Sequence, residues 1–200
     1  MPWEGAATRL EGRLVVVEPL GPEHEDDLWE AAQDPAVWRW LPIYAAADRE
    51  SFHAWLDDAL ERRDAGLDVP YAVVDRPTGK AIGSTRYLTL RPEHRGLEIG
   101  WTWNASSSWG TGANAEAKLL LLRHAFETLG CMRVEFKTDS RNARSREALE
   151  AMGASFEGIF RNHMLMPVTG IRHSAYYSIT VEDWPEIKAN LTAKQLATSN

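Results

Sequence analysis

Residues 97–130, LEIGWTWNASSSWGTGANAEAKLLLLRHAFETLG, combine a strand pattern, a polar turn and a helix pattern. In the first part apolar and polar residues alternate, which is typical of a strand with one buried face. We therefore expect a strand from Leu97 to Asn104. The residues predicted on its core face are Leu97, Ile99, Trp101 and Trp103. Those predicted on a polar, partly open face are Glu98, Gly100, Thr102 and Asn104.

The turn that follows carries Gly110 and Gly112, and the next helix is expected to begin near Ala113. The first N–H groups of a helix lack internal acceptors and carry the positive end of its dipole, so they can bind a phosphate. Apolar residues recur at helical spacing along this helix, at Ala115, Leu119, Leu122, Phe126 and Leu129. This pattern predicts a central helix. A buried crossover with a glycine turn and no ligand explains the spacing equally well.

Length and composition favour one domain over residues 1–200, with frayed ends at about residues 1–8 and 195–200. The net charge of −7 argues against a general nucleic-acid surface and suits a cationic amine substrate. The single Cys131 excludes an internal disulfide framework, and no apolar run approaches membrane-spanning length. We expect a soluble cytoplasmic protein with no nucleic-acid or membrane partner. Exposed aromatic residues would allow a homodimer.

Periodicity and chain breakers predict a mixed order of elements along the chain. The expected strands are Arg13–Leu20, Tyr71–Asp75, Lys80–Leu90, Leu97–Asn104, Met132–Asp139, Ser155–Met166 and Arg172–Thr180. The expected helices lie within Pro22–Gln33, at Asp48–Arg63, from Ala113, at Asn142–Met152 and at Glu182–Leu191. This order has one crossover and no repeated βαβ unit, so it predicts an α+β (mixed α/β) fold.

The segment Trp109-Gly110-Thr111-Gly112-Ala113-Asn114 resembles the acetyl-CoA pyrophosphate loop of the GNAT N-acetyltransferases, Gln/Arg-x-x-Gly-x-Gly/Ala. Gly112 matches the glycine of this pattern, whereas Trp109 and Asn114 depart from its first and last positions. Glu116 follows the loop as a Glu does in the ribosomal-protein N-terminal alanine acetyltransferases, the branch that the chain resembles most. The element order matches the family over nearly the whole chain.

The resemblance implies a GNAT-type fold, in which helices flank both faces of a central twisted mixed sheet of about six to seven strands. It also implies acetyl-CoA (coenzyme A) as cosubstrate and no metal. The residues expected to contact the cosubstrate are Trp101, Thr102, Trp103, Trp109, Gly110, Thr111, Gly112, Ala113, Asn114, Asn142 and Ser145. Backbone N–H groups of a splayed or bulged strand near Trp101 to Trp103 would stabilise the oxyanion.

Asn142-x-x-Ser145 resembles the family's Asn-x-x-Ser, in which the Asn contacts the pantetheine arm and the Ser can protonate the departing thiolate. Asn142 is also placed to cap its helix, which is a sufficient structural reason for it. Ser145 shares a helical face with Ala148, Leu149 and Met152 and is predicted to point toward the body of the protein. Back-bonding within the helix is the alternative. Four nearby cations could meet cofactor phosphates, Lys137, Arg141, Arg144 and Arg146.

Glu98 is the first candidate for the general base, because it lies on the polar face of the central strand, as the base does in many family members. In the ribosomal branch the base lies at about the position of Met164, which cannot act as one. His163 is the second choice, although an ideal strand would turn it to the opposite face. Trp38, Trp40, His163 and Tyr177 are candidate substrate-binding residues, with Arg172 beside them. Packing explains the tryptophans equally well.

The predicted function is transfer of an acetyl group from acetyl-CoA to a primary amine by direct attack in a ternary complex. The acceptor is a protein N-terminal α-amine or a small-molecule amine. The alternative is a non-catalytic acyl-CoA-binding sensor or interaction module on the same fold. The sequence identifies neither the acceptor nor the length of the acyl group.

Overall fold

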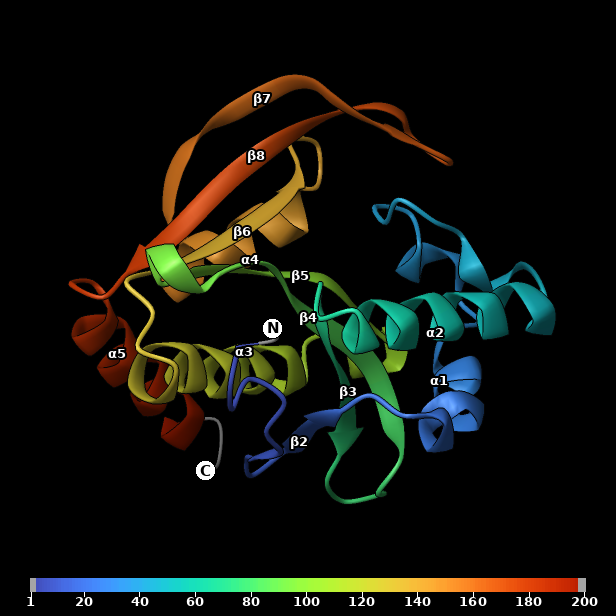
Figure 1. Ribbon diagram of the computed structural model, residues 1–200, viewed down its shortest axis with the longest axis horizontal. Helices are drawn as coiled ribbons and strands as arrows, with labels where there is room; N and C mark the ends of the chain where they lie inside the picture. Colours follow the sequence, from blue (N-terminus) through green and yellow to red (C-terminus); the bar gives the residue numbers. More distant parts are fainter. Residues whose placement is uncertain (1–2, 198–200) are drawn as a thin grey trace.

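The computed structural model describes residues 3–197, which contain one eight-stranded sheet in the order β1-β2-β3-β4-β5-β6-β8-β7 (Figure 1). The strands are β1 Leu10–Glu11, β2 Val15–Pro19, β3 Val69–Asp75, β4 Ala81–Arg91, β5 Gly96–Asn104, β6 Arg133–Asp139, β7 Ser155–Met166 and β8 Gly170–Thr180. All neighbours are antiparallel except β5 and β6. The predicted fold class is confirmed. The sheet is larger than expected because β1, with two residues, is too short to leave a sequence pattern.

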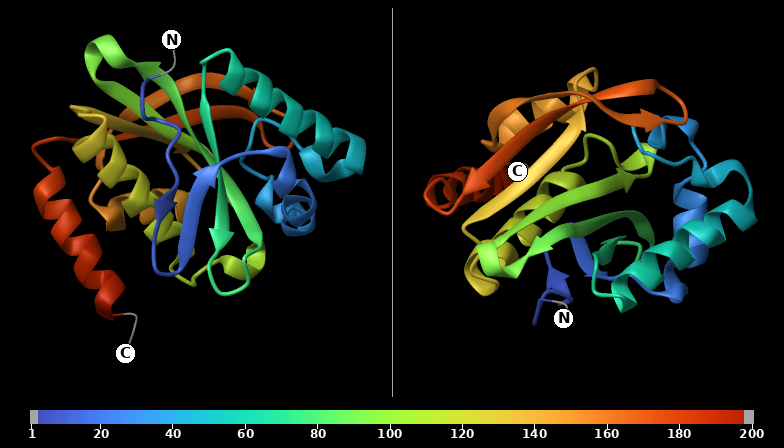
Figure 2. Two further views of the ribbon diagram at one scale, coloured as in Figure 1. Left: turned by 60° about the horizontal axis from the view of Figure 1, so that its bottom comes forward. Right: turned by 45° about the horizontal axis from the view of Figure 1, so that its top comes forward.

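Helices cover both faces of the sheet, as the resemblance implied (Figures 1 and 2). They are α1 Glu25–Ala31, α2 Arg49–Asp64, α3 Ala113–Arg123, α4 Ala143–Met152 and α5 Trp184–Ala197. A π-helical turn, His124–Thr128, continues α3. No helix among the described residues has the length and apolar character needed to cross a lipid bilayer.

Two apolar cores lie on opposite faces of the sheet. The larger joins α3, α4 and α5 to residues such as Leu97, Ile99 and Phe136. The smaller joins α1, α2 and the segment between them to Ala72 and Trp103. The central strands therefore contribute side chains to both cores.

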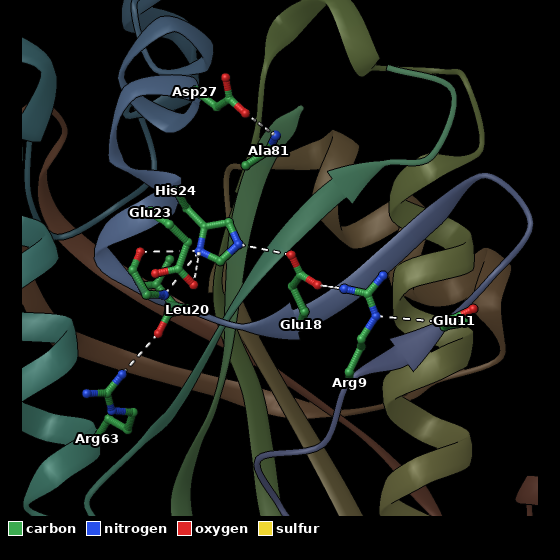
Figure 3. A network of polar contacts seen from close by, with 10 residues as sticks. Arg9, Glu11, Glu18, Leu20, Glu23, His24, Asp27, Arg63 and Ala81 are labelled. Atoms are coloured by element: carbon green, nitrogen blue, oxygen red, sulfur yellow. Dashed lines mark hydrogen bonds and ion pairs between the residues drawn. The ribbon is translucent and has the colours of Figure 1, made fainter. Parts of the chain in front are cut away.

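A polar network along β2 ties the sheet to α1 and α2 (Figure 3). Glu18 accepts a hydrogen bond from Arg9, and its other oxygen lies 3.1 Å from Nε2 of His24. Arg63 donates to the carbonyl oxygen of Leu20 at 3.1 Å. The network fixes the start of the α1 region against the sheet.

Regular structure and tertiary contacts extend close to both ends of the described residues. The hydroxyl of Tyr71 donates to the carbonyl of Ala6, which is buried, and α5 continues through Ala197. Fraying at about residues 1–8 and 195–200 stays a prediction. Residues 1–2 and 198–200 lie outside the described residues.

Glu116, on the first turn of α3, is a buried structural carboxylate. Its oxygens accept backbone N–H groups of Arg13 at 3.0 Å, Leu14 at 2.6 Å and Val15 at 2.8 Å. A side chain at Gly12 would meet it, because a Cβ there would lie 2.5 Å from Glu116 Oε2. Glu116 thus locks the turn between β1 and β2 onto the N-terminal end of α3.

We predict that Glu116→Gln lowers the free energy of unfolding by about 2 kcal/mol, because a carboxamide loses one acceptor and aims an NH2 group at backbone donors. Urea unfolding measures the change. Glu147→Gln is the matched control, since Glu147 is exposed on α4. Equal stability of the two variants would contradict the structural assignment of Glu116.

Candidate active site

The sheet opens between β5 and β6. These parallel strands pair only from Gly96 with Arg133 to Glu98 with Glu135. Beyond that point β5 stays paired with β4, while β6 pairs with β8 up to Asp139, so the two strands diverge (Figure 2). The site is built around this divergence.

A bulge on β5 lies at the opening. Trp101 has φ 51°, in the left-handed region that a bulky side chain rarely adopts. Two residues of β5, Trp101 and Thr102, lie opposite a single residue of β4, Thr85. The bulge reverses the alternation of faces. Trp101 and Trp103 pack with the smaller core, and Thr102 faces α3. The prediction that both tryptophans share a face with Leu97 and Ile99 is therefore wrong.

The glycine turn delivers the N-terminal end of α3 to one side of the opening. Gly110 and Gly112 have φ 81° and 91°, and the N-cap residue of α3, Gly112, has no side chain to cap the helix. The N–H of Ala113 reaches Thr111 Oγ1 at 3.3 Å. Within residues 3–197 we find no intramolecular acceptor for the N–H groups of Asn114 and Ala115. These donors and the helix dipole fit an anionic group.

Trp109 departs from the loop pattern yet has a defined place. Its indole Nε1 donates to the carbonyl of Asn104 at 3.0 Å, which ties the loop to the end of β5. The guanidinium of Arg144, on α4, stacks on the indole 3.6 Å from the ring centroid. The stack brings a cation from α4 to the loop position where the family pattern has Gln or Arg.

Asn142 caps α4, as predicted, by accepting the N–H of Ser145 at 3.2 Å. The side chain of Ser145 is half-buried, and Leu149 and Met152 on the same helix are buried. Ala148 is exposed, so the buried face of α4 is narrower than the sequence suggested. Ser145 therefore borders the body of the protein at the N-terminal end of this helix.

Glu98 lies on the sheet face opposite α3, at the last paired position before the opening. It is 3% exposed, and Lys137 Nζ lies 3.0 Å from its carboxylate. Burial raises the pKa of Glu98, and the charge and hydrogen bond of Lys137 oppose that rise. A carboxylate in this environment is a stronger base than an exposed one.

A second bulge, on β7, moves His163. Residues 161–163 interrupt the pairing with β8, and Asn162 has φ 50°. His163 Nδ1 consequently lies 2.9 Å from Ser174 Oγ, and its ring centroid lies 5.8 Å from that of Tyr176. His163 therefore shares the face of Glu98, contrary to the ideal-strand prediction. Burial lowers its pKa.

Two of the candidate substrate-binding residues belong to the interior instead. Trp38 is fully buried against Trp103, with its Nε1 donating to the carbonyl of Ala32, so its packing interpretation holds. Tyr177 is buried on the α3 face, and its hydroxyl donates to Glu150 at 2.7 Å. Trp40 is half-buried, and Arg141 lies 5.8 Å from its ring centroid.

Sequence reasoning missed Tyr176 and Lys118. Tyr176 pairs with Lys137 across β6 and β8, so it shares the face of Glu98, and its ring lies 4.2 Å from that of Phe160. An open hollow of ≈ 820 Å³ borders the nearby bulge. Lys118 is a buried cation in the leucine-rich pattern of α3, and that break in an apolar run was the available signal.

Comparisons with known proteins agree with this architecture. Residues 13–155 match the acetyltransferase (GNAT) domain family. The FsC-acetyl coenzyme A-N(2)-transacetylase of Aspergillus fumigatus is 28% identical over 184 residues, 86% of this chain and 75% of that protein. A GCN5-related N-acetyltransferase from Brucella melitensis is 31% identical, with a TM-score of 0.87 over 94% of this chain and 85% of that chain. Mycobacterium smegmatis RimJ in complex with CoA-disulfide shares the fold, at 20% identity and a TM-score of 0.78 over 94% of this chain and 93% of that chain.

The family match runs from the start of β2 to the start of β7 and therefore contains the diverging strands, the bulge and the glycine turn. Donors at a helix N-terminus on one side and a buried carboxylate on the other suit a reaction between an anionic acyl donor and an amine. The chain belongs to the GNAT family of acetyl-CoA-dependent N-acetyltransferases.

Proposed function

We propose that this protein transfers the acetyl group of acetyl-CoA to a primary amine by direct attack while both substrates are bound. The observation that carries the proposal is the divergence of β5 and β6 beyond Glu98, with α3 on one face and a polar set of side chains on the other. Two substrates can then meet from opposite faces of the sheet.

The residues that would hold the cosubstrate lie on the α3 side. The N–H groups of Asn114 and Ala115 would bind the pyrophosphate, and Arg144, stacked on Trp109 of the same loop, would add a positive charge. Asn142 and Ser145 border the same side on α4 and would contact the pantetheine arm. The cosubstrate supplies the thioester, whose carbonyl carbon is the electrophile. Backbone donors at the β5 bulge would stabilise the negative charge that develops on its oxygen.

Glu98 would take the proton of the acceptor, directly or through water. At pH 7 about one α-amine in ten is neutral, which costs about 1 kcal/mol, whereas a lysine-like amine costs about 4.6 kcal/mol. A single buried carboxylate beside Lys137 is better suited to deprotonate an α-amine than a lysine-like amine. We therefore infer an α-amine or an amine of similarly low pKa as acceptor.

The acceptor would lie among Glu98, His163, Tyr176 and Phe160 on the open side. Aromatic rings with polar tips suit a partly apolar acceptor that carries one amine. The relative from Aspergillus fumigatus is named for transfer at an N(2) position. This name supports keeping a small-molecule amine as a candidate acceptor, in addition to a protein N-terminus.

An acetyl-CoA consumption assay against N-terminal peptides, amino acids, polyamines and aminoglycosides tests the proposal. Absence of turnover across the panel, despite coenzyme A binding, would favour the sensor.

We predict that Gly112→Val weakens coenzyme A binding at least tenfold, about 1.4 kcal/mol, because a branched side chain at this turn displaces the helix N-terminus. Calorimetric titration measures the affinity. Gly79→Val is the matched control, since Gly79, in the β3–β4 turn, also has a positive φ, 71°, and a Cβ added there would meet no described atom within 4 Å. Equal affinities of the two variants would refute the assignment of this anion site.

We expect Glu98→Gln to slow acetyl transfer about 100-fold while coenzyme A binding is retained, because the carboxamide cannot accept the proton. Ser145→Ala should slow transfer by a smaller factor. Steady-state kinetics and calorimetry separate the two quantities. Retention of full activity by Glu98→Gln would exclude Glu98 as the base.

The rate should fall on the acid side as Glu98 is protonated, and this limb should lie above the ordinary range of a glutamate because burial raises its pKa. Lys137 lowers the pKa of Glu98, so Lys137→Met should move the limb to higher pH. The pH profile of kcat/KM measures the limb. A limb that stays in place would show that another group titrates.

A further inference from the structure

Lys118 carries a buried amine in the interior of the site. It is 8% exposed, and its Nζ donates to Thr102 Oγ1 at 2.7 Å. The ring of Phe136, on β6, has its centroid 5.9 Å from Nζ. The amine therefore lies on the α3 side of the opening, between a residue of β5 and a residue of β6 that both stand beyond the last paired position.

The other lysines of the sequence have different surroundings. Lys80, Lys137 and Lys188 form ion pairs with Glu30, Glu98 and Glu127 at 3.0, 3.0 and 2.7 Å. Lys194 is exposed and donates to the carbonyl of Ala151. Within the described chain, Lys118 forms no ion pair. An ammonium has three N–H donors, and the Thr102 hydroxyl accepts one of them.

Burial of a lysine amine without a carboxylate beside it disfavours its charged form, and a leucine would pack there without that cost, so a role in packing alone does not account for Lys118. Thr102, which accepts from the amine, also lies within hydrogen-bond distance of Thr85, with 2.8 Å between the two hydroxyl oxygens. The bulge itself turns Thr102 toward α3. The irregular backbone at Trp101 thus places the Thr102 hydroxyl where it accepts from the Lys118 amine, close to the point where the strands separate.

We propose that Lys118 is a catalytic residue that gives a proton to the sulfur atom of the departing coenzyme A. The inference rests on the proposed acetyl transfer. When the acceptor nitrogen bonds to the acyl carbon, the carbon–sulfur bond breaks and its electron pair stays on sulfur. One ammonium proton of Lys118 then moves to sulfur, and the neutral amine regains a proton from solvent. The acceptor nitrogen loses one proton, so charge and atoms balance.

The acidity of the group suits this step. Burial lowers the pKa of Lys118 to about 7, while the charge of Glu98 acts in the opposite direction. A thiol has a pKa of about 8.5, so transfer from Lys118 to a thiolate is downhill. A serine hydroxyl is a far weaker acid than either group. Ser145 is therefore better suited to donate a hydrogen bond to the sulfur than to give up its proton.

Among the charged groups near the opening, Lys118 is the proton donor on the α3 side of the sheet. Glu98 is the titratable group whose charge acts on the amine. Lys137, Glu135 and Arg172 act in turn on the charge of Glu98. Phe136 and the leucines of α3 supply no charge.

The test compares Lys118→Met with the wild type in single-turnover acetyl transfer across pH. Methionine is unbranched, is only one atom shorter than lysine and removes the buried amine, so the variant should fold. We expect a rate about 100-fold lower. The wild-type rate should fall on the alkaline side as Lys118 loses its proton, and the variant should lack this limb. Ser145→Ala should keep the limb, and the exposed Lys80→Met should match the wild type.

A second measurement is independent of turnover. In protein labelled with ¹³C at the lysine ε-carbons, we expect one signal that titrates near neutral pH, disappears in Lys118→Met and shifts on addition of coenzyme A. A Lys118 signal that titrates like that of an exposed lysine would overturn the proposal. So would an unchanged pH profile in an active Lys118→Met, or mass spectrometry that finds Lys118 itself acetylated. If the wild type neither binds coenzyme A nor transfers acetyl, the proposed function fails instead.

Discussion

The structure depends on the short ladder between β5 and β6. Parallel pairing ends after Glu98 and Glu135, because each strand keeps its other neighbour and the two halves of the sheet twist apart. A longer ladder would keep the two strands paired along their length. With the ladder this short, β5 and β6 separate beyond Glu98 and Glu135 in the middle of the sheet.

The two faces of that opening have opposite chemical character. On the α3 side, the uncapped helix N-terminus and Arg144 are suited to anionic groups. On the other side, a buried carboxylate, a histidine and a tyrosine are suited to an amine. This arrangement supports the proposed direct transfer, in which the two substrates approach from opposite faces and no covalent intermediate has to move.

Bulges set the orientation of the side chains at the opening. The β5 bulge at Trp101 sends the tryptophans to one core and Thr102 to the other side, and the guanidinium of Arg86 stacks 4.6 Å from the Trp101 ring centroid. The β7 bulge at Asn162 brings His163 to Ser174. Strained backbone of this kind persists where surrounding packing holds it, and it concentrates at functional sites.

The order of the elements, the central strand and helix, the glycine turn and the Asn142 cap could all be predicted from the residues alone, because they follow from local periodicity and backbone chemistry. The same reasoning pointed to Glu98 on the polar side of β5. The three-dimensional structure was needed to show that Trp101 and Trp103 face the smaller core and that Lys118 lies at the opening. A bulge depends on how two strands pair, and the environment of a lysine depends on what packs around it, so neither is encoded in the spacing of residues along one segment.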